Sequence, residues 1–322
     1  MSDAGARSDA PDAGPGGLRA DDRPVRAPLD PATTGLPRVV ATDLDGTLLD
    51  GQGQVSDRTR AVLADLDAAG VEVVFVTARP PRWLTRFTDA VGGHGRVICI
   101  GGACVLDLAS GETLDTCGFD DDAARAVVTG IRTALPHAAL AFERADGVVF
   151  DPTYPNREPA LDPGLWSVPV EETLGLVGAR GPVSKILALD PERIPPPGVF
   201  VDPPEEIRLA QEQFFTAVRA AVGQHAQLAY SGAVGLAELM PPGVDKAAAL
   251  ARWCARLGVD AADVWAFGDM PNDLPMLTWA GRGVAVANAH RDVLACADAV
   301  VGHHDADGVA EELAAALAGA RA

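Results

Sequence analysis

The chain has 322 residues, which is enough for two domains or for one domain with a large insertion. Its formal net charge of −19 argues against a nucleic-acid partner, because a phosphate backbone needs a basic protein face, but it leaves room for a small phosphorylated metabolite. Hydrophobic residues make up 48% of the sequence and allow a large core, yet no apolar run is long enough to span a membrane and no signal-peptide pattern opens the chain.

The first segment, residues 1–37, is rich in Ala, Gly, Pro, Asp and Arg and contains almost no large apolar residues. Such a segment cannot bury enough apolar surface to offset the entropy lost on ordering. We therefore predict a disordered N-terminal tail, with a docking segment as the alternative.

A strand-like apolar stretch begins at Val39 and ends in Asp43 and Asp45, which a Gly-Thr turn follows at once. Side chains alternate between faces in an extended segment, so the two carboxylates leave the strand end on the same side. Carboxylates this close repel each other unless a cation or a shared proton lies between them. One can hold a metal and attack while the other carries protons. An acidic loop without function is the alternative.

The next elements alternate between helix and strand. They are predicted, in order, as a helix at 57–69 capped by Ser56, a strand at 71–76, a helix from Pro80 to about Val91 and a strand at 97–100. The β-branched run at 71–76 is typical of a strand that is buried on both faces. This alternation predicts an α/β fold with a doubly wound, Rossmann-like parallel sheet.

The pattern changes after residue 107. Up to about residue 230 we predict helices at 120–135 and 205–222 and short strands at 138–142, 148–150, 183–189 and 227–230. Short strands mixed with two helices suggest a separate α+β domain, residues 108–230, inserted into the sheet domain.

The first pattern resumes near residue 231. The predicted elements are a strand at 236–239, a helix from 246, a strand at 264–267, a helix ending near 280, a strand at 283–286 and a last helix at 308–317. We therefore assign residues 38–107 and 231–318 to one discontinuous α/β core domain.

Polar groups fall at strand ends or helix starts of this core, where ligands bind in α/β sheets. Besides Asp43 and Asp45, Thr77 ends the second strand and can donate its hydroxyl to an anion. Lys246 begins a helix, a position that the helix dipole disfavours for a cation unless an anion lies beside it. Taken alone, such a threonine is more often structural and such a lysine is more often a surface charge.

A further group follows the turn at Gly268. Asp269, Asn272 and Asp273 place three acidic or amide side chains within five residues. Hard oxygen ligands of this kind suit Mg²⁺. A helix N-cap would explain one of the three residues but not all of them.

Motifs of rival chemistries are missing from the sequence, including the dinucleotide-binding glycine pattern, the Walker lysine loop and the Gly-x-Ser-x-Gly elbow. His303 and His304 could bind a metal, with a solvated loop as the alternative. The cysteines are odd in number and have no close spacing typical of zinc or redox sites, so we expect reduced core thiols of a cytosolic protein. They are Cys99, Cys104, Cys117, Cys254 and Cys296.

The segments 43–48, Thr77, Lys246 and 268–273 resemble, in order, the four motifs of the haloacid dehalogenase superfamily. The large insert between the second and third motifs resembles the C2-type cap of its Cof-like phosphatases. The likeness covers about Val39 to Leu317. It implies an α/β core that carries an inserted α+β cap.

The resemblance implies a role for each acid. Asp43 would be the nucleophile that forms an aspartyl-phosphate, and Asp45 would be the general acid and base. Asp269 would bind Mg²⁺ together with the Asp43 carboxylate and the Asp45 backbone carbonyl. Asp273 would support the metal site indirectly, through the residues that bind the ion.

The remaining motif residues would bind phosphate: Thr77 and Lys246 would hold the phosphoryl oxygens, and Asn272 would contact the phosphate. The expected activity is Mg²⁺-dependent hydrolysis of a small phosphomonoester, a sugar phosphate or a phosphorylated cofactor. A phosphomutase, or a binding protein that senses a metabolite without turnover, is the alternative.

Two departures from the family pattern stand out. Gly101–Ala103 replaces the common Asn-Gly-Ala, which removes an amide near the cap hinge, and Thr77–Arg79 carries Ala in place of the usual Gly. Substrate choice would depend on the cap. Its candidate contacts for anionic substrate groups, with solvated surface charge as the alternative, are Arg82, Arg144, Arg157 and Lys185.

Overall fold

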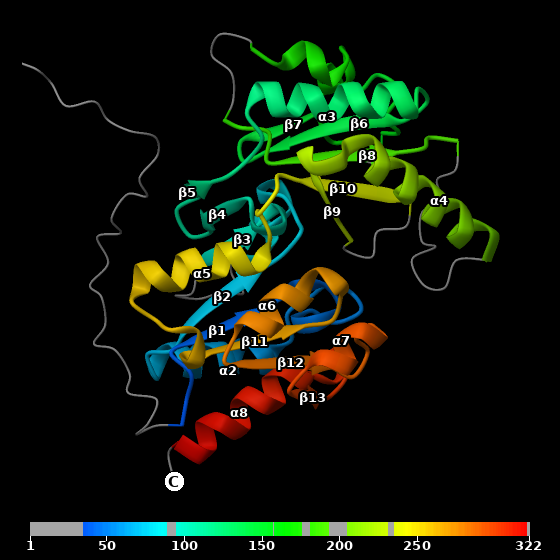
Figure 1. Ribbon diagram of the computed structural model, residues 1–322. Coiled ribbons are helices and arrows are strands. Elements are labelled where there is room, and N and C mark those ends of the chain that lie inside the picture. Colours follow the sequence, from blue (N-terminus) through cyan, green and yellow to red (C-terminus); the bar gives the residue numbers. More distant parts are fainter. Residues whose placement is uncertain are drawn as a thin grey trace, which may run out of the picture.

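The computed structural model describes residues 35–88, 95–156, 158–175, 181–192, 205–230 and 235–320. The predicted tail, residues 1–37, lies almost wholly outside these ranges. The described strands form two sheets, and Figure 1 shows the second sheet stacked above the first.

The first sheet has eight described strands in the order β13-β12-β11-β1-β2-β3-β4-β5. All neighbours from β13 to β3 are parallel, and β4 and β5 add an antiparallel edge. The strands are β1 Val39–Thr42, β2 Glu72–Val76, β3 Arg96–Cys99, β4 Cys104–Asp107, β5 Glu112–Thr116, β11 Val264–Gly268, β12 Arg282–Val286 and β13 Ala299–Val301. Every residue of β1 is buried, as expected for a central parallel strand covered on both faces. The predicted α/β, Rossmann-like core is confirmed.

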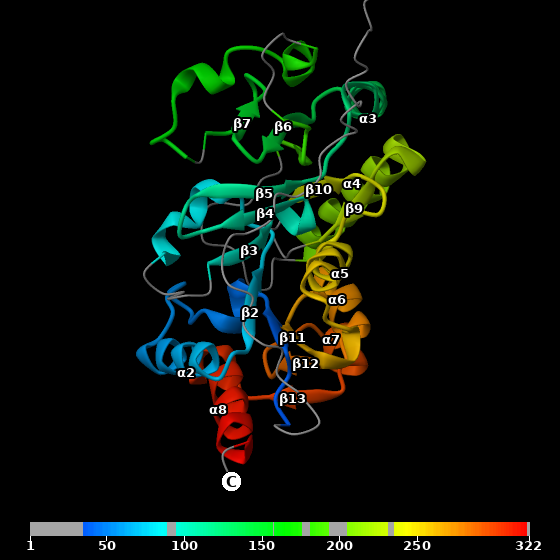
Figure 2. The ribbon, with the colours of Figure 1, turned by 90° about the vertical axis from the view of Figure 1, so that its left-hand side faces the viewer.

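Helices cover both faces of this sheet (Figure 2). On one side lie α2 (Asp57–Ala68) and α8 (Gly308–Ala320), which contact each other. On the other side lie α5 (Lys246–Leu257), α6 (Leu274–Trp279) and α7 (Arg291–Cys296). Ser56 caps α2 by accepting a hydrogen bond from Thr59 N, as the sequence predicted.

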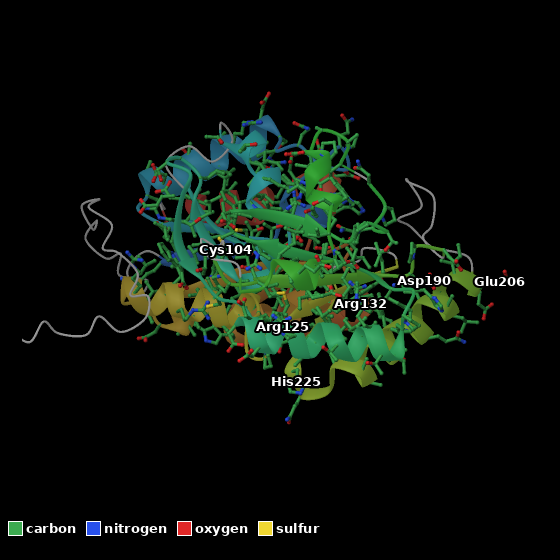
Figure 3. All side chains as sticks on the ribbon, turned by 90° about the horizontal axis from the view of Figure 1, so that it is seen from above. Cys104, Arg125, Arg132, Asp190, Glu206 and His225 are labelled. Atoms are coloured by element: carbon green, nitrogen blue, oxygen red, sulfur yellow. The ribbon has the colours of Figure 1, made fainter. Side chains whose placement is uncertain are left out.

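The second sheet is antiparallel, with the described order β7-β6-β8-β10-β9. Its strands are β6 Ala139–Arg144, β7 Gly147–Phe150, β8 Lys185–Leu189, β9 Gln227–Ala229 and β10 Leu236–Met240. One face packs Leu140, Phe142 and Ile186 against α3 (Asp121–Ala134) and α4 (Glu205–Val222). Figure 3 shows Arg125 and Arg132 on α3. Neighbouring side chains of a strand alternate between its two faces. Glu143, Lys185 and Glu238 therefore lie on the face of this sheet that is turned away from α3 and α4.

The sheets divide the chain differently from the predicted boundaries. The sequence placed 236–239 in the core and 108–230 in the insert, but β10 pairs with β8 and β9 of the second sheet, and β5 belongs to the first sheet. Short strands of this kind do not indicate their partners, because long-range pairing decides sheet membership. The division into core and cap domains stays a prediction.

The predicted helix from Pro80 to Val91 is wrong over its described part. Two 3₁₀ turns, Pro81–Trp83 and Thr85–Phe87, stand there, and residues 89–94 lie outside the described ranges. Trp, Thr and Phe have weak helix propensity, and the Thr88 hydroxyl donates to the Thr85 carbonyl instead. None of the helices in the described ranges is long and apolar enough to span a bilayer.

Candidate active site

Strand register brings three motif segments to one edge of the first sheet. Thr42, the last residue of β1, is paired with Phe75 of β2 and with Phe267 of β11. The residues that follow, Asp43 and Asp269 among them, therefore leave the sheet side by side, and Asp43 N donates to Phe267 O at 3.0 Å. This is the carboxyl edge, where α/β sheets bind ligands.

Lys246 lies between two carboxylates. Its Nζ is 2.5 Å from Asp43 Oδ1 and 2.6 Å from Asp273 Oδ1, and the side chain is buried. The helix α5 starts at Lys246, as predicted, and Asp245 caps it by accepting from Ala248 N. Burial opposes the charged lysine, but the Asp273 and Asp43 carboxylates outweigh it and raise the pKa of Lys246.

Asp269 is held from several directions. Thr47 donates its hydroxyl to Asp269 Oδ1 at 2.7 Å, and the Asp269 carbonyl accepts from His290 N at 2.7 Å. Asp273 Oδ2 accepts from the backbone N–H groups of Asp269 and Met270 at 3.0 and 2.9 Å. Thr47 and Asp273 therefore fix the turn that carries Asp269.

The carboxylates of Asp43, Asp269 and Asp273 each offer an oxygen within 4.8 Å of the others, and all three residues are buried. Burial raises the pKa of Asp43 well above its ordinary value, and although Lys246 lowers it, the neighbouring carboxylates raise it further. Burial and the charge of Asp273 raise the pKa of Asp269 to about 6. A divalent cation with hard oxygen ligands would offset this repulsion, so the donor set fits Mg²⁺.

Asp45 lies close enough to this acidic group for its charge to act on Asp43 and Asp269. Its side chain is 53% exposed, and both oxygens accept from Arg79, one from Nε at 2.6 Å and the other from the guanidinium terminus. Its carboxylate is therefore not one of the clustered oxygens, although it lies on the turn directly after Asp43. The Asp45 carboxylate is accessible to solvent.

Two predicted phosphate contacts follow strands that end at this same edge of the sheet, Thr77 after β2 and Asn272 after β11. Thr77 is buried at the end of β2, and its Oγ1 accepts from Arg79 N at 3.1 Å. The buried Oδ1 of Asn272 has no hydrogen-bond partner among the described residues. A buried oxygen of this kind indicates a ligand or water partner.

Two glycines allow backbone segments to approach the site. A Cβ on Gly46 would lie 2.6 Å from Asp269 Oδ2, and Gly46 has a φ of +77°. A Cβ on Gly102, where φ is +108°, would overlap the Asp245 carbonyl beside Lys246. The turn after β1 and the loop after β3 therefore both require glycine.

The cations proposed for anionic substrate groups are already paired. Arg82 binds Glu143 and Glu158, Lys185 binds Glu238 and the Ala78 carbonyl, and Arg144 NH1 donates to the Gly181 carbonyl. Arg157 lies outside the described residues.

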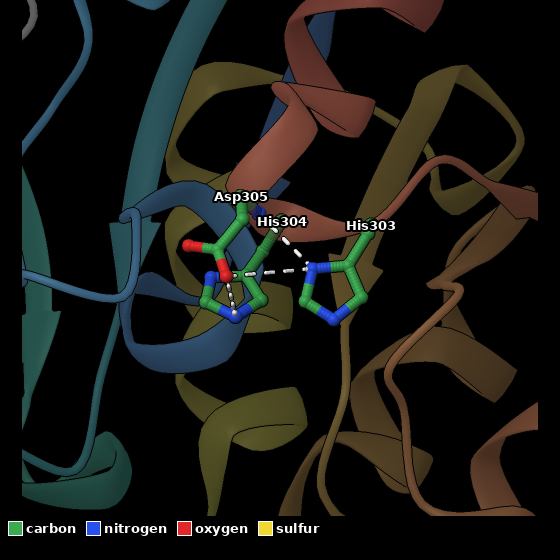
Figure 4. Close-up of side chains that lie close together, drawn as sticks. All are labelled: His303, His304 and Asp305. Carbon is green, nitrogen blue, oxygen red and sulfur yellow. Dashed lines mark hydrogen bonds and ion pairs between the residues drawn. The ribbon is translucent and has the colours of Figure 1, made fainter.

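His303, His304 and Asp305 form a second group of ligand-type side chains, drawn in Figure 4. The rings stack with centroids 4.7 Å apart, His303 Nδ1 accepts from Asp305 N, and His304 Nδ1 contacts the Leu49 carbonyl at 2.7 Å. Gly51 N donates to Asp305 Oδ1 at 2.5 Å. These contacts pack the turn against the loop that follows the aspartate motif.

Three residues that had no predicted role also lie at this site. Thr47 contacts Asp269, Arg79 contacts Asp45, and Asn288 Nδ2 donates to the Gly46 carbonyl at 2.7 Å. Thr47 stands inside the Asp-Gly-Thr turn, and Asn288 follows the carboxyl end of β12. The rule that ligands bind at strand ends could have marked both.

Comparison with known proteins is consistent with this geometry. A family model described as haloacid dehalogenase-like hydrolase matches residues 40–164 and 200–313. The putative phosphatase YxeH of Bacillus subtilis is 27% identical over 86% of this chain and 97% of its own length. The HMP-PP phosphatase of Cronobacter sakazakii is 29% identical over 86% of this chain and 94% of its own length. The structure of BT1666 from Bacteroides thetaiotaomicron, at 24% identity, has a TM-score of 0.66 and covers 89% of this chain and 98% of its own.

Proposed function

Because the chain belongs to the haloacid dehalogenase-like hydrolase family, we propose that it hydrolyses small phosphomonoesters with the help of Mg²⁺ and through an aspartyl-phosphate on Asp43. The chain is a phosphatase of the Cof-like type. The observation that carries the proposal is the position of Asp43 at the end of β1, 2.5 Å from Lys246 Nζ and beside the Asp269 and Asp273 carboxylates.

The acidic group supplies the metal site. The Asp43 and Asp269 carboxylates and the backbone carbonyl of Asp45 would hold Mg²⁺, and Asp273 would orient Asp269 through its bond to the Asp269 N–H. When bound, Mg²⁺ supplies positive charge that neutralises phosphoryl oxygens and keeps the Asp43 carboxylate ionised.

The chain's own residues supply the remaining parts of the mechanism. A carboxylate oxygen of Asp43 attacks phosphorus, a bond from this oxygen to phosphorus forms, and the bond to the leaving oxygen breaks. Asp45 gives its proton to that leaving oxygen. Lys246, Thr77 and Asn272 hold the phosphoryl oxygens during the transfer.

The second half-reaction restores the enzyme. Asp45, now ionised, takes a proton from a water molecule that attacks phosphorus, and the bond between phosphorus and Asp43 breaks. Inorganic phosphate leaves and the Asp43 carboxylate returns. Because Arg79 binds both oxygens of Asp45 in this structure, we propose that Arg79 orients the carboxylate for proton transfer.

The second sheet, with α3 and α4, is proposed to act as a cap over the carboxyl edge of the first sheet. Lys185 of β8 reaches across to the Ala78 carbonyl at 2.9 Å. The relatives named HMP-PP phosphatase support a small phosphorylated metabolite as substrate. We propose that it is a phosphorylated cofactor or a sugar phosphate.

The test is hydrolysis of p-nitrophenyl phosphate with Mg²⁺ present. Asp43→Asn removes the nucleophilic oxygen, and we expect kcat to fall by at least about a thousandfold. The matched control Asp146→Asn makes the same chemical change in an exposed turn and should leave kcat unchanged. Turnover by Asp43→Asn at the wild-type rate would show that another group attacks phosphorus.

A further inference from the structure

A network of five charged side chains lies between the loop that carries Thr77 and the inner face of the second sheet. Arg82 donates from NH1 to both oxygens of Glu143 at 2.9 Å, and from Nε and NH2 to Glu158 at 3.0 and 2.8 Å. Lys185 Nζ donates to Glu238 Oε1 at 3.0 Å. Among the residues that the structure describes, two cations therefore face three carboxylates, which leaves one net negative charge.

The loop from Thr77 to Arg82 connects this network to the reacting groups. Thr77 follows β2, which pairs with the strand that leads to Asp43; Ala78 accepts from Lys185, and Arg79 binds Asp45. Asp45 is also the exposed member of the site, with 53% of its side chain accessible. The leaving group of a substrate takes its proton from Asp45, so it must lie on the solvent-exposed side of the site, next to the charged network.

The two cations are largely occupied by protein acceptors: four of the five N–H groups of Arg82 and two of the three of Lys185 already donate to carboxylates or a carbonyl. The Arg82 guanidinium uses all three of its nitrogens on carboxylates, and the Lys185 side chain is only 4% exposed between a carboxylate and a carbonyl. An anion that displaced Glu143, whose side chain is 2% exposed, would leave a buried carboxylate unpaired. Such an exchange is unfavourable.

We infer that this phosphatase selects phosphomonoesters whose leaving group is neutral or carries an ammonium group, and discriminates against a leaving group that carries a carboxylate. The inference rests on the proposed function and names its substrate class. It reverses the expectation that Arg82 and Lys185 bind anionic substrate groups. Discrimination arises from a repulsive element, the net negative charge of this network, and repulsion of the wrong ligand is a common source of specificity.

Three sugar phosphates that differ in one group provide the test: glucosamine 1-phosphate, glucose 1-phosphate and glucuronic acid 1-phosphate. Each competes with p-nitrophenyl phosphate, and its inhibition constant is measured with Mg²⁺ saturating. We expect glucuronic acid 1-phosphate to bind about tenfold more weakly than glucose 1-phosphate, and glucosamine 1-phosphate at least as tightly as glucose 1-phosphate.

The variant Glu158→Gln removes one negative charge from the network and keeps an oxygen that can accept from Arg82 and from Trp83 Nε1. We expect it to reduce the ratio of the glucuronic acid and glucose inhibition constants to about threefold or less. The control Glu205→Gln makes the same change on α4, where the side chain is 77% exposed, and should leave the ratio as in the wild type.

Several results would overturn the inference: glucuronic acid 1-phosphate binding as tightly as the neutral sugar, an unchanged ratio in Glu158→Gln, or no measurable competition by any of the three. Failure of the proposed function gives a different result, because p-nitrophenyl phosphate would then not be hydrolysed at all.

Discussion

At the scale of single residues, the raised pKa of Asp269, about 6, makes proton and metal binding competitive. The ordinary value is 3.8, so between these two pH values the folded protein without metal holds a proton that the unfolded chain has lost. Its stability therefore falls as pH rises through this window. A metal ion must displace that proton, which makes its affinity rise with pH.

We therefore predict that Mg²⁺ raises the melting temperature more at about pH 7.5 than at about pH 5, because proton competition is weak only above the pKa of Asp269. Thermal unfolding with and without Mg²⁺ at both pH values measures this. In Asp269→Asn the Mg²⁺ effect should be largely lost at both pH values. An equal effect at both pH values in the wild type would place the metal elsewhere.

Thr47 gives a second residue-level prediction. Its hydroxyl donates to Asp269 Oδ1 at 2.7 Å and is buried, so Thr47→Val removes the bond and keeps the shape of the side chain. We expect the dissociation constant of Mg²⁺ to rise about tenfold, because such supporting contacts orient a metal ligand. The measurement is Mg²⁺ titration of activity. An unchanged constant would mean that Asp269 does not depend on this contact.

At the scale of elements, the loop after β3 is coupled to the start of α5. Gly102→Ala would force a Cβ into the Asp245 carbonyl at a φ of +108°, and we expect a loss of about 2–4 kcal/mol in unfolding free energy and about tenfold in kcat, since Lys246 follows directly. The control Gly111→Ala has a φ of +73° and open space, and should cost about 1 kcal/mol without loss of kcat.

Chemical denaturation and steady-state kinetics on both variants measure the two losses. If Gly102→Ala were as stable and active as Gly111→Ala, the contact between this loop and α5 would have no role in placing Lys246.

Local signals predicted the elements that have strong start and stop residues. The cap at Ser56 and the helix that starts at Lys246 agree with the structure, as does α4 at Glu205–Val222. The segment after Pro80 failed because its proline start was read as an α-helix, although the following residues favour short turns. The partners of β5 and β10 could not be predicted, because pairing is decided by contacts far away in sequence.

At the scale of the whole molecule, the site joins residues that are far apart along the chain. Lys246 and Asp43 are separated by 203 positions, and Thr47 and Asp269 by 222. The sequence was enough to predict that these distant motifs form one site, because parallel strands bring their carboxyl ends to one edge of the sheet. The pairing of Arg82 and Lys185 with Glu143, Glu158 and Glu238 could not be predicted, because composition does not show which opposite charges meet.

The charge of the whole chain gives a further prediction. A net charge of −19 repels a phosphate dianion, and salt screens that repulsion. We expect kcat/KM to rise as ionic strength increases from about 0.01 to about 0.15 M at saturating Mg²⁺. Steady-state kinetics at constant pH measure it. A fall with salt would show that positive charge dominates the path to the site.

The most direct test of the central claim, that Asp43 carries the phosphoryl group between substrate and water, is to trap the acyl phosphate. The enzyme is quenched in acid during turnover of an aryl phosphate, reduced with borohydride and digested, and the peptide that contains Asp43 is analysed by mass spectrometry. The account predicts homoserine at position 43, in larger amount in Asp45→Asn, where water is not activated. Modification of another residue, or none during active turnover, would contradict it.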